Sequence, residues 1–216
     1  MQVKIAAGYC LPAGISPVDL LQGGVRMIYT NEYDSPLGNM LLFGDEQGLT
    51  GLRFTEGDRY VDLGLKKQAY RCETAYFDQA KEWLDIYFSG RDPGFFPQIH
   101  LTGSDFRKRV GEILCEIPYG KTVSYGWIAD ILARERGLKK MSAQAVGGAV
   151  GHNPICIIVP CHRVVGAAGS LVGYSGGLLR KKALLELEGH DVNRFRMPAK
   201  GTALPYGFPG RHRSRS

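Results

Sequence analysis

The sequence predicts an α+β protein with a small N-terminal antiparallel-sheet/helix domain, followed by a C-terminal winged helix-turn-helix domain that carries a candidate active-site cysteine. Three observations predict this. Strand-like runs separated by turn residues fill 27–54, amphipathic helices dominate 104–193, and a β-branched run ends at Pro160-Cys161-His162-Arg163. We place the domains at 27–103 and 104–193, with a loose extension over 1–26 and a basic, disordered tail over 194–216.

The overall composition excludes several classes of protein. With 216 residues, 44% of them hydrophobic, the chain can bury one sizeable core or two small ones. It has no apolar stretch of about 18 residues and no signal-peptide pattern at its start, so we expect no membrane association. Its five scattered cysteines argue against a disulfide framework and against a zinc ribbon. We expect a reduced, cytoplasmic protein, or a nuclear one if the source is eukaryotic.

The net charge of +6 is unevenly distributed along the chain. Residues 194–216 carry six basic residues and no acidic one, while residues 104–193 hold 12 basic against 8 acidic residues. Residues 1–103 hold 9 basic against 13 acidic residues. This asymmetry suggests that only the second domain meets a polyanion, although ordinary surface charge explains it equally well. The basic tail is either an accessory DNA arm or a segment without functional consequence.

The first domain has the pattern of a small sheet covered by one helix. Three strand-like runs, Met27–Tyr33, Met40–Phe43 and Leu49–Phe54, are separated by turn residues and predict an antiparallel meander. Residues 56–72 have no clear pattern. From Glu73 to Phe88 apolar residues recur at helical spacing, and we expect this helix to cover one face of the meander.

The second domain begins with three predicted helices. Ser104, Ser124 and Ser142 each precede a helical pattern and are suited to be N-caps. The second and third of these helices predict a helix-turn-helix, with two packed core helices as the alternative. The third is nearly all Ala, Gly and Val apart from Gln144, so it has little with which to read base edges. If it binds DNA, we expect shallow, backbone-dominated contact by a protein that detects lesions or DNA structure.

The stretch Ile157–Val165 predicts a buried strand that leaves its sheet at Pro160, because proline cannot donate a ladder hydrogen bond. The thiol of Cys161 and the imidazole of His162 lie side by side at the end of this stretch, and the cationic Arg163 would favour the reactive thiolate. Residues Val164–Tyr174 predict a glycine-turned hairpin, the wing. A last helix follows over Leu178–Leu187 and ends at Glu188-Gly189.

Four motifs in this domain resemble the signature of the 6-O-alkylguanine-DNA alkyltransferases. They are Ala145–Ala149, Gly151–Pro154, Ile158–Val165 with its Pro-Cys-His-Arg core, and Gly173–Leu178. The resemblance extends over 104–190 and more weakly over 27–103. It implies a monomer that binds double-stranded DNA containing alkylated guanine through the minor groove and flips the damaged base out of the helix. The alkyl group then moves irreversibly to a cysteine in a single turnover, with no cofactor. We expect no metal, because the first domain has no cysteine-histidine cluster for the zinc site that some members of the family carry.

The resemblance also implies a catalytic role for five residues. Cys161 is the nucleophile and His162 its base through a bridging water, a geometry that fits adjacent residues on an extended chain. Glu188 orients His162. A base is needed because a free cysteine titrates near ~8.5 and is mostly protonated at neutral pH. Tyr125 donates to the N3 edge of the leaving guanine, and Asn153 is the hinge between the recognition helix and the active-site strand.

Further residues are implied to hold the substrate. The main-chain carbonyls of Val164 and Cys161 accept from the exocyclic amine of guanine, Tyr174 and Ser175 wall the pocket, and Lys181 has a weaker role. The residues implied to contact DNA are Ala143, Gln144, Ala145, Gly147 and Arg163. Gln144 departs from the arginine finger that is usual in the family, so we expect weaker extraction of the damaged base.

Each of these residues alone also has a purely structural explanation, as a packing tyrosine, a helix cap or a satisfied buried histidine. Together, in this order around one Pro-Cys-His-Arg, they favour a function. The other cysteines are expected to be structural. Two further classes remain open: a non-catalytic, alkyltransferase-like lesion-binding protein, which would lack the cysteine, and a cysteine hydrolase, for which the sequence shows no oxyanion hole. Cys161 is the residue that distinguishes the first of these.

Overall fold

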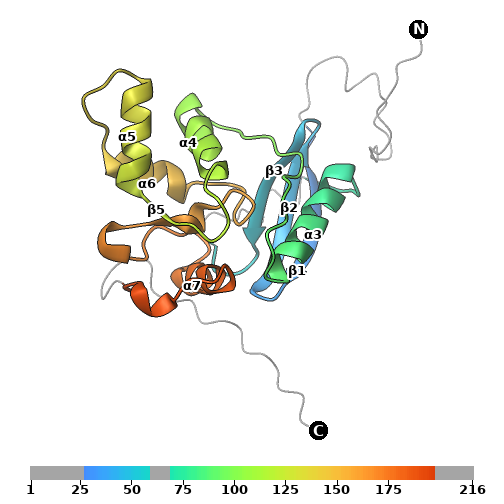
Figure 1. Cartoon of the computed structure of the whole chain (residues 1–216). Coiled ribbons are helices and arrows are strands. Elements are labelled where there is room, and N and C mark those ends of the chain that lie inside the picture. Colours follow the sequence, from blue (N-terminus) through green and yellow to red (C-terminus); the bar gives the residue numbers. More distant parts are fainter. Residues whose placement is uncertain (1–26, 59–68, 198–216) are drawn as a thin grey trace.

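The computed structural model describes residues 27–58 and 69–197 (Figure 1). The predictions for the extension over 1–26 and for 198–216 of the tail lie outside these residues. In the described ranges, no helix is both long and apolar enough to cross a membrane. The mixed α+β architecture that the sequence predicts is confirmed: a small sheet with one helix comes first, and a mainly helical part follows.

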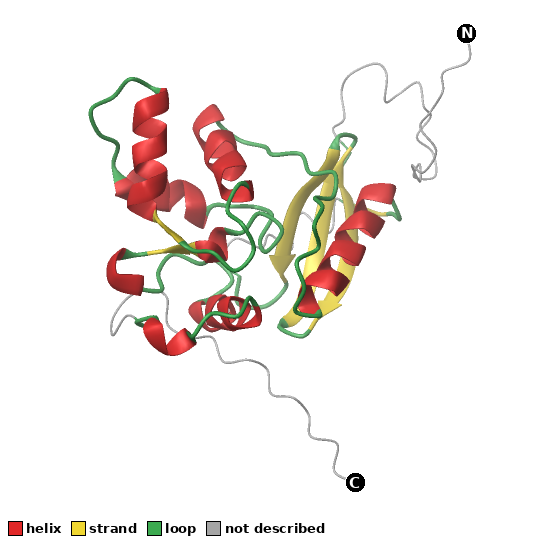
Figure 2. Ribbon diagram, viewed as in Figure 1, coloured by secondary structure: helices red, strands yellow, loops and turns green. Residues whose placement is uncertain are grey.

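The N-terminal part is the predicted antiparallel meander. Strands β1 (Tyr29–Ser35), β2 (Gly38–Asp45) and β3 (Gly48–Phe54) pair in sequence order. A fourth strand, β4 (Tyr70–Arg71), pairs in parallel with β1, and its two residues are too few to form a pattern in the sequence. Helix α3 (Ala75–Phe88) covers one face of this sheet (Figure 2). A Cβ on Gly44 would lie 2.5 Å from the Tyr76 ring, so this close contact between sheet and helix requires glycine.

The C-terminal part contains the predicted capped helices. Ser104, Ser124 and Ser142 accept hydrogen bonds from backbone amides in the first turns of α4 (Asp105–Cys115), α5 (Tyr125–Glu135) and α6 (Ala143–Gly151). Helices α5 and α6 pack together as the helix-turn-helix, and α4 packs on α6. The last helix, α7 (Leu178–Leu187), lies on the other side of the active-site stretch (Figure 1).

The predicted strand over Ile157–Val165 is wrong for most of its length. Residues before Pro160 form turns, Cys161–Arg163 form the 3-10 helix η1, and only β6 (Val164–Val165) pairs, in parallel with β5 (Val123–Ser124). Ile157 adopts a φ of 69°, which a β-branched residue tolerates only under strain of about 1–3 kcal/mol. Short local bonds, such as Ile158 N to the Cys156 carbonyl (2.9 Å), satisfy the backbone. The β-branched run therefore reflects burial and not a strand.

The predicted wing hairpin is also absent from the described structure. Residues 166–174 form a loop around the 3-10 helix η2 (Ala167–Gly169), closed by a bond from Gly166 N to the Ser170 carbonyl (2.8 Å). This loop pairs with a residue beyond the 3-10 helix η3 (Val192–Arg194): Leu171 N donates to the Arg196 carbonyl (2.9 Å). This pairing extends the folded chain to Met197, past the predicted start of the tail. We keep the name wing for residues 166–174.

The two parts of the chain meet at the active-site stretch. Leu52 in β3 donates its amide to the Pro154 carbonyl (2.9 Å), and Cys156 N donates to the Leu52 carbonyl (3.0 Å). Arg180 in α7 donates to the carbonyls of Leu37 and Glu56 and lies 4.1 Å from the centre of the Phe54 ring. One continuous hydrophobic core includes residues from both parts. The sheet therefore supports the loop that carries Cys161.

Candidate active site

Cys161 is held in η1 with only 2% of its surface exposed. Burial raises the pKa of its thiol, and a hydrogen bond from Asn153 and the positive charges of Lys181 and Arg53 oppose this rise. The cations that favour the thiolate are therefore Lys181 and Arg53, and not Arg163 as the sequence suggested. A thiol in this environment needs a neighbouring group to take its proton.

Glu188 caps the end of α7 and receives hydrogen bonds from four residues. Its Oε1 lies 2.7 Å from His162 Nε2 and 2.8 Å from Tyr87 Oη. Arg163 Nε lies 3.1 Å from Oε1 and 3.0 Å from Oε2, and Gly120 N donates to Oε2 at 3.1 Å. Burial raises the pKa of the carboxyl, but the bonds from His162 and Arg163 outweigh this effect and lower the pKa to about 2. Glu188 is therefore ionised at neutral pH.

His162 is fully buried beside this carboxylate. Burial lowers the pKa of its imidazole, which keeps the ring neutral, while Glu188 acts in the opposite direction. Because Nε2 faces a carboxylate, we assign the proton to Nε2 and the lone pair to Nδ1. Among the described residues Nδ1 has no hydrogen-bond partner. It is the atom that can accept a proton.

The geometric reason given for a bridging water is wrong, because Cys161 and His162 lie in a 3-10 turn and not on an extended chain. The predicted DNA contact of Arg163 is wrong as well. Its guanidinium is buried, donates to Glu188, and donates to the Ile117 carbonyl at 2.7 Å. The planar fork of arginine suits such a buried carboxylate, so Arg163 stabilises the site from inside.

A pocket of about 910 Å³ opens between the start of α5, the exposed face of α6 and the wing. Four predicted residues line it: Tyr125, Ala143, Gln144 and Gly147. Ala145 is exposed on α6 outside this lining. Burial raises the pKa of the Tyr125 phenol, and the nearby Cys161 contributes to the same rise. The Tyr125 hydroxyl donates to the Val172 carbonyl at 2.9 Å.

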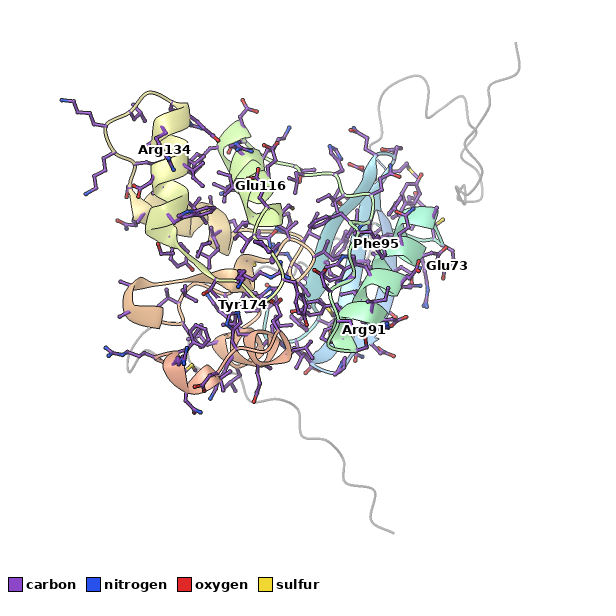
Figure 3. The ribbon with its side chains drawn as sticks, in the orientation of Figure 1. Glu73, Arg91, Phe95, Glu116, Arg134 and Tyr174 are labelled. Atoms are coloured by element: carbon purple, nitrogen blue, oxygen red, sulfur yellow. The ribbon has the colours of Figure 1, made fainter. Side chains whose placement is uncertain are left out.

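The wing closes this pocket through Gly173. The residue has a φ of 73°, and a Cβ there would lie 2.6 Å from Tyr125 Oη. Glycine is thus required for the wing to approach Tyr125. Tyr174 and Ser175 are buried deeper, and Tyr174 lies near the middle of the molecule (Figure 3). Burial, followed by the charges of Cys156 and Cys161, raises the pKa of the Tyr174 phenol. Tyr174 and Ser175 were predicted to wall the pocket, but the residues that line it do not include them.

Lys181 is a fully buried cation that holds the wing to the active-site stretch. Its Nζ donates to the carbonyls of Val164 (2.6 Å) and Val172 (2.7 Å). Burial lowers its pKa to about 8. The Val164 carbonyl keeps a second lone pair, which remains able to accept from a base.

Asn153 links the end of α6 to the same stretch. Its Nδ2 donates to the Val159 carbonyl (2.8 Å) and the Ile155 carbonyl (3.2 Å), and its Oδ1 accepts from Ile155 N (3.1 Å). Arg53 donates to the Asn153 carbonyl at 3.1 Å. These bonds fix the turns that precede Cys161, which accords with the hinge role.

The sequence did not indicate three contributors to the site: Tyr87, Arg53 and Gly120. In the sequence Tyr87 is one apolar position of an amphipathic helix, Arg53 lies within the strand-like run Leu49–Phe54, and Gly120 lies in the turn after the first helix of the second domain. No local signal predicts that Tyr87 and Gly120 bind Glu188, 101 and 68 positions away, or that Arg53 binds the Asn153 carbonyl, 100 positions away. Within the described ranges, no group of three or more His, Cys, Asp and Glu is arranged to hold a metal ion.

Two family models match the chain. The model described as 6-O-methylguanine DNA methyltransferase, DNA binding domain, matches residues 105–190, and the ribonuclease-like domain of the same family matches residues 28–96. A methylated-DNA–protein-cysteine methyltransferase of Mycobacterium tuberculosis is 45% identical over 162 residues, which cover 75% of this chain and 93% of the relative. One from Methanosarcina acetivorans is 40% identical over 162 residues, covering 75% and 99%.

Solved structures give the same result. The crystal structure of the Mycobacterium tuberculosis O6-methylguanine methyltransferase is similar with a TM-score of 0.64 and 42% identity, over 81% of this chain and 97% of that chain. The M. tuberculosis OGT in complex with DNA has a TM-score of 0.61 and 42% identity, over 77% and 94%.

Proposed function

Because the chain belongs to the 6-O-methylguanine DNA methyltransferase family, we propose that it repairs DNA directly by moving the alkyl group of a 6-O-alkylguanine onto its own Cys161. It is a methyltransferase that acts on methylated DNA and uses a protein cysteine as the acceptor. DNA is its partner. The non-catalytic lesion-binding alternative is not favoured, because the curated relatives are methyltransferases and Cys161 is present.

The assignment of Cys161 as the nucleophile rests on a buried proton relay beside it, formed by His162 and Glu188. Burial raises the pKa of the thiol, which favours its protonated form. The His162 ring is neutral, its Nε2 is held by ionised Glu188, and its Nδ1 has no hydrogen-bond partner among the residues that the structure describes. We propose that the Cys161 thiol passes its proton to His162 Nδ1, through a water, when the alkylated guanine enters the site. Glu188 then stabilises the imidazolium that forms.

The transfer is an in-line displacement at an sp³ carbon. A bond forms between Cys161 Sγ and the alkyl carbon, the bond from that carbon to O6 breaks, and guanine leaves with the electron pair. We assign Tyr125 as the donor that stabilises the leaving base, because it lines the pocket and burial keeps its phenol protonated. The carbonyls of Val164 and Cys161, the Ser175 amide and Tyr174 hold the base, and Lys181 fixes the Val164 carbonyl.

The DNA face we propose is the surface of α6 around the pocket. Ala143, Gln144 and Gly147 line the pocket, and Ala145 is exposed beside them. Small side chains let the DNA minor groove approach the backbone of α6 closely, which suits DNA binding that does not depend on reading the bases. We further propose that the protein acts as a monomer on alkylated guanine in double-stranded DNA, in the cytoplasm or, in a eukaryote, the nucleus. The proposed domains are 27–103 and 104–197, because the hydrogen bonds of Arg196 to Gly169 and Leu171 tie it to the predicted second domain, 104–193.

Intact-mass spectrometry after mixing with duplex DNA containing 6-O-methylguanine tests the assignment. We expect each molecule to gain the mass of one CH₂ unit, and peptide mapping to place it on Cys161. Cys161→Ala should bind the same DNA without any gain. Cys156→Ala is the matched control, since Cys156 lies in the same buried stretch, and it should gain the methyl group. Tight binding by the parent protein with no mass gain would support a damage sensor instead.

Gln144→Arg is expected to accelerate repair of duplex DNA. Gln144 is exposed at the start of α6, at the mouth of the pocket, where a side chain can fill the space left by a flipped base. A charge-assisted bond contributes about 1 kcal/mol more than a neutral one, which corresponds to about a fivefold faster single-turnover rate. The rate with a free 6-O-alkylguanine base should not change, because no extraction is needed. An unchanged or lower rate on duplex DNA would contradict the prediction.

A further inference from the structure

Tyr87 reaches the catalytic relay from the other part of the chain. It lies near the end of α3, is fully buried, and belongs to the helix that covers the N-terminal sheet. Its hydroxyl lies 2.8 Å from Glu188 Oε1 and 3.3 Å from His162 Nε2. The sequence predicts this residue only as part of an apolar helix face, and the proposed function does not use it.

We propose that Tyr87 is a positioning residue of the Cys161 site, whose hydroxyl donates to Glu188 and thereby limits how strongly that carboxylate favours protonation of His162. The inference rests on the proposed function, because it concerns the base of that reaction. It also makes the N-terminal part a contributor to the chemistry and not only a support.

The arrangement of donors around Glu188 gives the hydroxyl this effect. Tyr87 and His162 both donate to Oε1, while Gly120 donates to Oε2 and Arg163 bridges the two oxygens. Two donors on one oxygen share its charge, so the tyrosine bond weakens the pull of Oε1 on the His162 N–H. Without it, Oε1 stabilises the imidazolium more strongly, and we expect the pKa of His162 to rise.

Tyr87 itself remains a neutral donor. Burial first, and then the charge of Glu188, raise the pKa of its phenol well above the usual range. The other charged groups that act on His162 are Arg163, on its own 3-10 helix, and Lys181 from α7, and both lower its pKa. The ring of Tyr119, from the loop after α4, contacts the ring of Tyr87. All of them are retained when only the Tyr87 hydroxyl is removed.

The ring of Tyr87 is held independently of its hydroxyl. It stacks on Trp83 with centroids 5.1 Å apart and contacts the edges of Phe88 (5.5 Å) and His162 (6.2 Å). Phenylalanine can therefore occupy the same place. Tyr87→Phe removes one oxygen atom and one hydrogen bond to Glu188 while preserving the packing of α3.

The experiment follows the titration of His162 by NMR in the parent protein and in Tyr87→Phe, with His162→Gln to assign its signal among the five histidines. We expect the pKa of His162 to rise by about half to one unit in Tyr87→Phe. The acid limb of the pH profile of the methyl-transfer rate should move to higher pH by the same amount. The rate on that limb should therefore fall by about three- to tenfold, and the alkaline plateau should change by less than about threefold.

Tyr119→Phe is the matched control, because the Tyr119 hydroxyl donates to the Leu187 carbonyl (3.3 Å) and not to Glu188. It should leave the titration of His162 unchanged. In a Glu188→Gln background, Tyr87→Phe should no longer shift it. The proposal is overturned if Tyr87→Phe lowers only the melting temperature, with the titration and the rate profile unmoved. If the parent protein transfers no methyl group, the proposed function fails, while the NMR titration still tests Tyr87.

Discussion

Glu188→Gln is expected to slow methyl transfer by about 10²–10⁴-fold, the range that a lost general base accounts for. In the structure all the groups around this carboxylate are donors, from Tyr87, His162, Arg163 and Gly120. A glutamine must direct its NH₂ group at one of them. Where that group faces His162 Nε2, the imidazole takes the other tautomer, with its proton on Nδ1, and Nδ1 can no longer accept the proton of the thiol.

The measurement is a single-turnover rate with protein in excess over duplex DNA containing 6-O-methylguanine. Binding of that DNA should be retained, since Glu188 is buried at the end of α7 and does not line the pocket beside α6. Glu186→Gln, an exposed residue two positions earlier on the same helix, is the matched control and should react at the parent rate. If Glu188→Gln reacts within about threefold of the parent protein, the relay assigned to Glu188 and His162 is wrong.

Arg163→Met is expected to lower the free energy of unfolding by about 3–5 kcal/mol, the usual result of removing one partner of a buried ion pair. The change leaves Glu188 ionised in the interior with two fewer bonds and leaves the Ile117 carbonyl without its donor. Urea denaturation should show a lower midpoint with an unchanged slope. Arg194→Met, whose side chain is 84% exposed beside Asp191, is the control and should show no measurable change.

The same pair determines how stability depends on pH. Glu188 has a pKa of about 2 in the folded protein and ~4.3 in an unfolded chain, so its contribution is present above that value and is lost as the pH falls toward 2. Burial lowers the pKa of His162, so below ~6.5 the unfolded chain binds a proton that the folded protein resists. Both effects reduce stability in acid. In Arg163→Met the pKa of Glu188 should rise toward its unfolded value, so less stability should be lost as the pH falls below ~4.3. If the free energy of unfolding of Arg163→Met were no lower than that of Arg194→Met, the bonds from Arg163 to Glu188 would not stabilise the fold.

The sequence predicts those features of the fold that depend on near neighbours. The serine caps of α4, α5 and α6 are confirmed because a cap depends only on residues two or three positions away. The three-stranded meander is confirmed because turn residues separate its short strands. The motif around Cys161 likewise places the proposed nucleophile and its proposed base, His162, at adjacent positions of the chain.

The features that the sequence did not predict depend on distant contacts. Ile157 accepts a left-handed conformation because Asn153 and β3 hold the turns on either side of it, which no local propensity reveals. The resemblance implies that Arg163 contacts DNA, whereas in the structure its side chain binds Glu188, 25 positions away. The wing forms no hairpin because its partner lies beyond α7.

The two hydrogen bonds between Leu52 and the stretch Pro154–Cys156 have a consequence for folding. They join β3 to the loop that carries the thiol, inside a core common to both parts. The amide of Cys156 can exchange its hydrogen with solvent only when this seam opens, and opening it exposes apolar surface from both parts at once. We therefore expect one cooperative melting transition for the whole chain. If the N-terminal or C-terminal part were replaced by that of a relative, we expect the chain to fold only if the new part preserved the pairing between Leu52 and Pro154–Cys156.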